Sequence, residues 1–132
     1  MGRINYERHR RQIERLYEDK CTIYRYEKVT DPETEETTLK PVAVYADQPC
    51  RISQKALGTN NQTEAQNDIR YETKLFIAPE LEIKQGDMIE AVKGRITAMG
   101  WKAIGPARKY EAGEPFLYPS HQEVSIQRKE WA

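Results

Sequence analysis

The sequence predicts a mainly β protein: a small antiparallel β-barrel or sandwich with an N-terminal α-helix and a long mobile loop. In residues 69–77, apolar side chains alternate with charged ones, which is typical of a strand with one buried face. Gly86-Asp87 follows as a turn before a second apolar segment, since glycine tolerates a positive φ and aspartate bonds nearby backbone. Six or seven short strands of this kind can be traced. We therefore expect one domain over residues 1–132.

The expected helix covers residues 3–19. Its apolar residues form a narrow stripe at helical spacing: Tyr6, Ile13, Leu16 and Tyr17. A stripe this thin cannot hold a helix alone, so we expect the helix to pack against the sheet or against a neighbouring subunit. The other faces are densely charged, and three of their arginines are candidate interface residues: Arg8, Arg11 and Arg15.

The barrel is expected over residues 21–130 and begins with a hairpin. Strands at 21–29 and 37–45 flank a polar, acidic turn around Asp31-Pro32. Pro41 indicates an edge strand or a bulge, because proline cannot donate to the sheet. The sequence therefore predicts a hairpin with an acidic tip.

Five further strands complete the predicted barrel. They are expected at residues 48–54, 69–77, 88–92, 95–101 and 121–129. A Lys93-Gly94 turn would join the third and fourth of these. Residues 102–120 are expected to be irregular, because glycine and proline recur there. Inward-facing positions of the last strand would be Val124 and Ile126.

Residues 55–68 have almost no apolar content and no periodicity, which predicts a mobile loop. One interpretation is a plain surface loop. The other is a segment that becomes ordered only on assembly. Under the second interpretation, the candidate interface or channel residues are Leu57, Gly58, Thr59, Asn60, Asn61, Gln62 and Thr63.

Composition limits the possible partners and the compartment. The chain has 21 basic and 21 acidic residues, so it has no general attraction for nucleic acid or an anionic membrane. No apolar run is long enough to span a bilayer, and the N-terminus is polar from Gly2 onward, so we expect neither a membrane partner nor a signal peptide. Cys21 and Cys50 are too few for a disulfide scaffold, and we expect two reduced, partly buried thiols in the cytoplasm.

The sequence offers little to support catalysis. His9 and His121 belong to no metal-binding spacing, and there is no Cys-x-x-Cys. The acidic cluster at 31–36 could suggest paired carboxylates for acid–base chemistry, but we expect it to be a solvated turn. The glycines from 94 to 105 form no phosphate-binding motif. We expect no enzyme activity, no metal and no cofactor.

Two binding hypotheses remain. Aromatic residues on strands, beside arginine and lysine, could form a stacking surface for single-stranded nucleic acid, although core and interface packing explains them better. Charge is also uneven along the chain, with a mildly basic segment at 3–20 and an acidic one at 27–36. This is either ordinary surface patterning or a basis for complementary contact with other proteins.

Three segments carry a family resemblance. They are Tyr6-Glu7-Arg8-His9-Arg10-Arg11, Cys21-Thr22-Ile23-Tyr24, and Ile83-Lys84-Gln85-Gly86-Asp87-Met88-Ile89 followed by Arg95-Ile96-Thr97-Ala98. In this order, and in a chain of this size, they resemble the head-closure or stopper proteins of long-tailed bacteriophages, in particular the YqbH/XkdH-like proteins of Bacillus prophages.

The resemblance implies a small β-barrel without catalytic residues that assembles as a ring at the portal vertex of a DNA-filled head. Its implied partners are other copies of itself, the portal-bound adaptor and the tail or tail-terminator protein, with packaged DNA close by in the channel. The implied location is the host cytoplasm during assembly and then the head-tail junction of the virion. A tail-completion or adaptor protein at the same junction is the nearest alternative.

Overall fold

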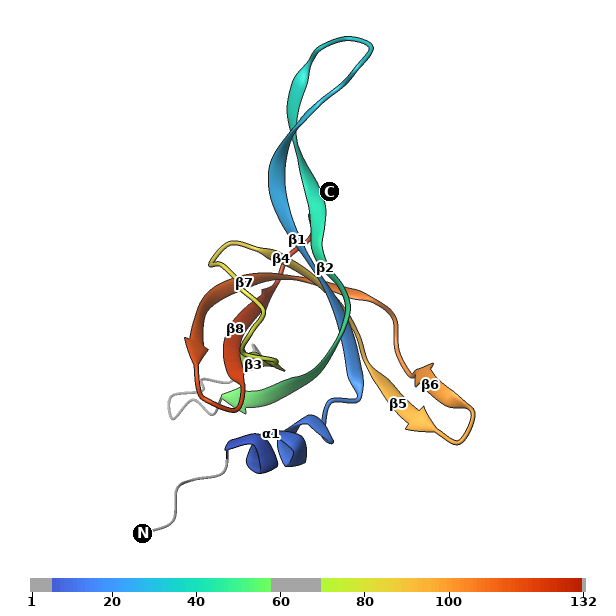
Figure 1. Ribbon diagram of the computed structural model, residues 1–132, viewed down its shortest axis with the longest axis vertical. Helices are drawn as coiled ribbons and strands as arrows, with labels where there is room; N and C mark the ends of the chain where they lie inside the picture. The colour runs from blue at the N-terminus through green and yellow to red at the C-terminus, as the bar shows by residue number, and fades with distance from the viewer. Residues whose placement is uncertain (1–5, 58–69, 132) are drawn as a thin grey trace, which may run out of the picture.

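A closed six-stranded antiparallel barrel dominates the computed structural model, which describes residues 6–57 and 70–131 (Figure 1). The elements are α1 (Tyr6–Glu14), β1 (Asp19–Thr30), β2 (Thr37–Leu57), β3 (Arg70–Ile77), β4 (Met88–Val92), β5 (Gly94–Thr97), β6 (Gly100–Ala103), β7 (Arg108–Leu117) and β8 (Gln122–Arg128). The barrel closes in the order β1-β2-β3-β8-β7-β4, and β5-β6 form a separate hairpin. The predicted fold class, mainly β with an N-terminal helix, is confirmed.

Alternating side chains fill the inside of the barrel. Its most deeply buried apolar residues are Ile23, Leu75, Ile77, Ile89 and Val124. Val124 and Ile126 face inward as predicted. The alternation in residues 69–77 places Tyr71 on the face of its strand that also carries Leu75 and Ile77, yet Tyr71 is 53% exposed. The reason is its position, because β3 pairs with β8 only from Thr73 onward and the barrel is open at Tyr71.

The predicted Gly86-Asp87 turn is present just before β4. Gly86 has a φ of +93°, a conformation that favours glycine. The buried Asp87 carboxylate accepts hydrogen bonds from Lys84 N at 2.9 Å and from the Arg25 guanidinium at 2.9 and 2.7 Å. The turn therefore anchors β1 to the loop before β4, so it is structural.

The helix is shorter than the predicted 3–19. It ends at Glu14, and residues 3–5 lie outside the described residues. Tyr17 and Asp19 are both buried just beyond the helix. The Asp19 carboxylate accepts hydrogen bonds from Ile52 N at 2.9 Å and Gly94 N at 3.2 Å. These contacts require an extended chain at Asp19, which ends the helix early.

β2 is one strand of 21 residues where the sequence predicted two strands and the start of a loop. A bend with φ +49° at Asp47 lies where the break was expected, and the pairing with β1 shifts register nearby. Lys55 to Leu57 pair with β3, so the predicted loop at 55–68 cannot begin before residue 58. Residues 58–68 lie outside the described residues.

Lys93-Gly94 does not form the predicted turn. The chain passes from β4 into β5 there, and the β5-β6 hairpin turns instead near Met99, where Gly100 has a φ of +110°. The Trp101 ring covers Gly94 so closely that an added Cβ would lie 2.3 Å from it. Trp101 also donates from Nε1 to Glu18 O at 2.7 Å. Gly94 therefore serves close packing.

Residues 102–120 were predicted to be irregular, but they contain the ten-residue strand β7. Its pairing with β8 shifts register between Ala112 and Pro115. At Gly113, a Cβ would lie 3.1 Å from the Ser125 carbonyl oxygen. The bulge explains why glycine and proline interrupt the strand pattern without ending the strand.

Candidate interaction surface

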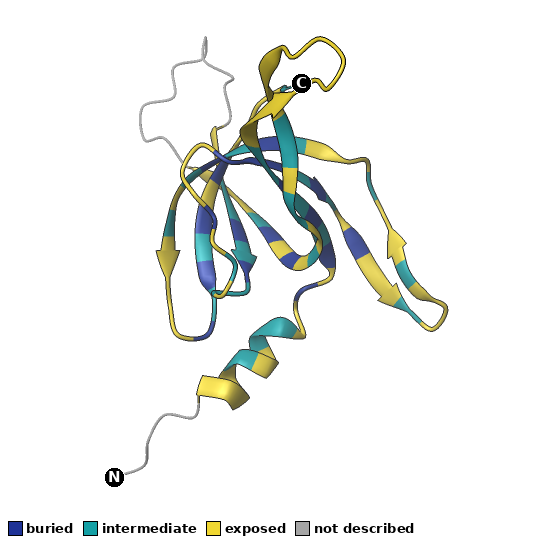
Figure 2. Ribbon diagram, turned by 45° about the horizontal axis from the view of Figure 1, so that its top comes forward, coloured by how far each residue is buried: buried dark blue, intermediate teal, exposed yellow. Residues whose placement is uncertain are grey.

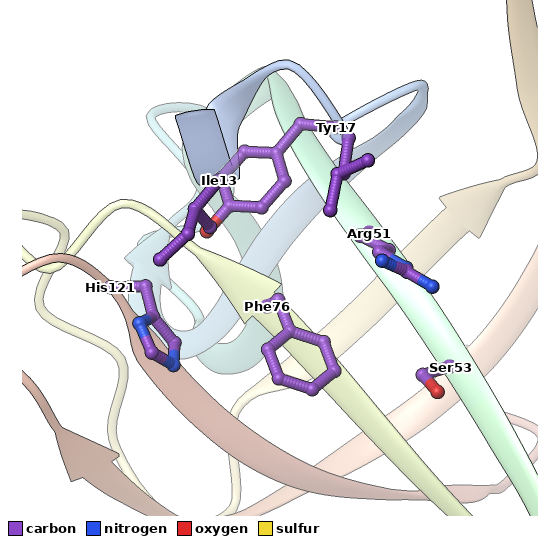
Figure 3. Close-up of a pocket in the computed structure, with 7 residues that line it drawn as sticks. Ile13, Tyr17, Arg51, Ser53, Phe76 and His121 are labelled. Atoms are coloured by element: carbon purple, nitrogen blue, oxygen red, sulfur yellow. The ribbon is translucent and has the colours of Figure 1, made fainter. Parts of the chain in front are cut away.

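A groove of about 290 Å³ separates α1 from the outer face of the barrel (Figure 3). Its lining residues are Ile13, Leu16, Tyr17, Arg51, Ser53, Phe76 and His121. Arg51 on β2 and Phe76 on β3 are directly opposed in the sheet, so both project from the same outer face. The chain after α1 supplies the facing wall with Leu16, which is 55% exposed.

An ion pair holds α1 over this groove. The Arg10 guanidinium contacts both carboxylate oxygens of Glu80, with 2.6 Å between Nη2 and Oε2, and its Nε donates to Glu14 at 2.7 Å. These bonds raise the pKa of Arg10 above its ordinary value, and the bond from Arg10 lowers the pKa of Glu80. Since no α1 residue is buried, this pair and the groove contacts position the helix.

Tyr17 gives the groove an unsatisfied polar group. Tyr17 is only 7% exposed, and its hydroxyl has no hydrogen-bond partner among the described residues. Burial raises the pKa of Tyr17 to about 12, so the hydroxyl stays protonated and remains a donor. Buried hydroxyls are usually bonded, and one without a partner therefore marks a place where an acceptor is missing.

A row of aromatic rings extends from the groove along the end of β7. Tyr118 stacks on His121 with 4.7 Å between centroids and 10° between planes. At one end of the row, the ring centroids of Phe76 and His121 are 5.9 Å apart. At the other end, the ring centroids of Phe116 and Tyr118 are 4.9 Å apart. Phe116 is 63% exposed, so the row joins the groove to open surface.

The β1-β2 hairpin projects beyond the barrel as a two-stranded ribbon, which we define as residues 26–40 (Figure 1). β4 pairs with β1 only up to Tyr24, and β3 pairs with β2 only from Cys50 onward. Residues 31–36 at the tip are all exposed (Figure 2). The predicted hairpin with an acidic tip is thus confirmed, and Pro41 lies on an edge as expected.

The β5-β6 hairpin is a second projection. Exposed apolar residues lie on it and just after it: Ile96, Met99 and Ile104. Met99, near the turn, is 99% exposed. Charged residues Arg95 and Lys102 form a cross-strand pair on the same hairpin and are also exposed.

The structure places the predicted site residues in three groups. The three candidate arginines are exposed: Arg8 and Arg11 lie on α1, and Arg15 follows its last residue. Of the loop candidates, Leu57 ends β2, and the others lie outside the described residues: Gly58, Thr59, Asn60, Asn61, Gln62 and Thr63. Gly86 and Asp87 form the structural turn described above.

Sequence reasoning missed the groove as a site. Phe76 offered a signal, because it interrupts the charged face of its strand with a large apolar ring. Arg51 and His121 gave none, since only the pairing of β2, β3 and β8 brings them close to Phe76.

Both thiols of the chain lie in the core of the barrel. Cys21 and Cys50 are buried, unlinked thiols, and the hydrogen bond between them, with burial, raises the pKa of Cys50 above its usual range. A raised pKa disfavours the reactive thiolate. Within residues 6–57 and 70–131, no group of three His, Cys, Asp or Glu residues is placed to hold a metal ion. In the same ranges, no helix has the length and apolar character to cross a membrane.

Fold and surface together define a small barrel with projecting arms and an outer groove. The chain belongs to the family of unknown function DUF6093, which it matches over residues 9–100. This range includes most of α1, the ribbon and β3, but not β7, β8 or His121. No curated protein and no solved structure matches the chain.

Proposed function

We propose that this protein is a structural component of the head-to-tail joining region of a long-tailed bacteriophage or prophage. Copies would form a ring at the portal vertex, close the DNA-filled head and dock the tail. The resemblance of the segments at 6–11, 21–24 and 83–89 to stopper proteins supports this proposal. Two of the three segments lie in elements that shape the candidate surface, α1 and β1.

The observation that carries the proposal is the ribbon, an arm whose two strands pair only with each other and not with the rest of the barrel. It extends roughly 20 Å past the last barrel pairing, at about 3.3 Å per residue. A two-stranded ribbon is at best marginally stable in water alone, so a projecting arm is best explained by a partner. Arms and grooves on a small barrel suit a protein that binds neighbouring subunits.

The partners follow from the proposed place in the particle. Other copies of the chain would lie beside it, the portal-bound adaptor on the head side and the tail or tail-terminator protein on the other. Packaged DNA would be near in the channel without being bound. Before assembly, the chain would reside in the host cytoplasm.

Two alternatives remain. A tail-completion or adaptor protein at the same junction would use the same arms. A single-strand nucleic-acid-binding barrel has one observation in its favour, the aromatic row at Phe76, His121, Tyr118 and Phe116. Oligonucleotide affinity that falls steeply with salt would favour that alternative.

Deletion of the coding sequence from an inducible prophage tests the proposal. We expect heads that leak DNA or fail to join tails, together with free tails, and rescue when the chain is supplied from a plasmid. Tailed, infectious particles assembled without the chain would contradict the proposal.

A further inference from the structure

We propose that the ribbon of one copy docks in the α1 groove of the next copy. The occupant of the groove is thus a second copy of this chain, bound head to tail. The inference names a contact within the proposed ring and rests on the proposed function for its setting, although the contact itself can be tested on the purified chain.

The groove has the character of a site for an apolar segment. Its walls are apolar at Ile13, Leu16 and Phe76. Leu16 is 55% exposed, so an apolar side chain placed against it would remove apolar area from water. The Tyr17 hydroxyl has no partner among the described residues, but its oxygen is fully buried and does not face the opening of the groove.

The lining of the groove carries an unpaired arginine. Arg51 lines the groove, is exposed and has no ion pair within the described part of the chain. Arg11 on α1 and Arg15 just after it are also exposed without an ion pair in that part, but neither lines the groove. The nearest carboxylate to His121 is Glu123, which also lies 3.8 Å from Lys74 Nζ. An acidic occupant is therefore favoured.

The ribbon presents the matching properties. Because side chains alternate, Tyr26, Leu39 and Pro41 lie on one face, and Leu39 is 65% exposed. From residue 26 to residue 40, the ribbon has five carboxylates and two lysines. Four of the carboxylates are at the tip: Asp31, Glu33, Glu35 and Glu36. Apolar area and charge thus complement the groove in the same segment.

Geometry requires the contact to be between copies. The ribbon and α1 lie at opposite ends of the molecule, with the barrel between them (Figure 1). A contact between two different surfaces is heterologous, and repetition of such a contact generates a ring or a filament. The ribbon contact would therefore extend from copy to copy instead of ending at a dimer.

The β5-β6 hairpin is a weaker candidate for the same groove. Its Met99 is fully apolar and exposed, but its neighbours Arg95 and Lys102 carry the same charge as Arg51. Like charges across an interface disfavour binding. The hairpin therefore supplies a matched control for the ribbon.

Three double variants of the full chain test the contact. Leu39→Lys/Glu36→Lys alters only the ribbon, and Leu16→Glu/Arg51→Glu alters only the groove. Ile96→Lys/Met99→Lys makes a comparable change on the control hairpin. All six positions are exposed, so each variant should keep the wild-type far-UV circular dichroism and melting temperature.

Sedimentation velocity at low salt is the readout, because salt screens exposed charges. We expect concentration-dependent self-association of the wild type and of the control variant. The ribbon and groove variants should each associate at least about tenfold more weakly. An equimolar mixture of the ribbon variant and the groove variant should form a 1:1 dimer, because the intact ribbon of the groove variant can dock in the intact groove of the ribbon variant. This dimer should not grow further, because its remaining ribbon and its remaining groove are the altered ones.

The inference is overturned if the folded wild type stays monomeric at low salt up to its solubility limit. It is equally overturned if either variant associates like the wild type, or if the mixture forms no dimer. These outcomes concern the contact alone. A chain that fails here but still localises to the head-tail junction would lose this interface and keep the proposed function.

Discussion

Buried carboxylates show how single residues tie the barrel together. Asp87 bonds to Arg25 and to Lys84 N, and Asp19 bonds to Ile52 N and Gly94 N. A buried carboxylate is costly unless such bonds satisfy it. Gly86-Asp87 could be predicted from the sequence as a turn, because glycine and aspartate favour one locally. Its partner Arg25 could not, since it is distant in the sequence.

Replacement of Asp87 by asparagine should lower the free energy of unfolding by about 2 kcal/mol, because a charge-assisted pair with Arg25 is lost. Urea denaturation measures the change. Glu82→Gln is the matched control, since the Glu82 side chain is 72% exposed and lies 3.7 Å from Lys84. If both variants lower the free energy of unfolding equally, the buried pair contributes no more to stability than an exposed one.

Gly86→Ala should destabilise the protein by about 1 kcal/mol or more through backbone strain alone. The φ of +93° disfavours any side chain, although an added Cβ would meet no atom within 4 Å. Gly105→Ala is the control, because its Cβ would lie 3.9 Å from Lys93 Cβ at an unstrained backbone. Thermal denaturation of the two variants distinguishes these effects. If Gly86→Ala leaves the melting temperature unchanged, a side chain at this positive φ causes no backbone strain.

Individual elements differ in how far local sequence determines them. Strands β1, β4 and β8 follow from alternation, and each is close to its predicted range. β7 was missed because the bulge near Gly113 breaks the pattern. The helix was predicted too long, because the buried side chains of Tyr17 and Asp19 override a helical pattern that continues past Glu14.

The attachment of α1 should depend on pH. The pKa of Glu80 is lower in the folded protein, so its ion pair with Arg10 stabilises the docked helix above the unfolded pKa of about 4.3. The contribution is lost as the pH falls through the folded value. It is small because the Glu80 side chain is 60% exposed.

Amide hydrogen exchange in α1 is the measurement for this effect. Protection of α1 should decrease below about pH 4 once intrinsic exchange rates are accounted for. At neutral pH, Glu80→Gln should reproduce the loss, whereas barrel amides should be unaffected. Undiminished α1 protection in Glu80→Gln would show that the groove contacts alone hold the helix.

Shortening of the ribbon should leave the barrel intact. Val29 and Thr38 are paired, so an Asn-Gly turn can replace residues 30–37. Because the barrel pairings of β1 and β2 lie elsewhere, we expect the melting temperature to stay within a few degrees of the wild type. A large decrease in melting temperature would show that the ribbon contributes to the stability of the barrel.

At the scale of the whole molecule, local sequence predicts the barrel but not the groove on its outer face. The fold class could be predicted because strand alternation, turn residues and length all indicate a small β protein. The groove could not be predicted, because its residues come from α1 and the segment after it, from β2 and β3, and from the turn before β8. Uneven charge did point to the two regions that the structure places at opposite ends, α1 and the ribbon.

The measurement that tests the central claim most directly is electron microscopy of phage particles in which this chain carries a label. The proposed function predicts label in a ring at the head-tail junction of every tailed particle, and loss of that density with loss of tails when the chain is absent. Label elsewhere on the particle, or mature particles that contain none of the chain, would contradict it.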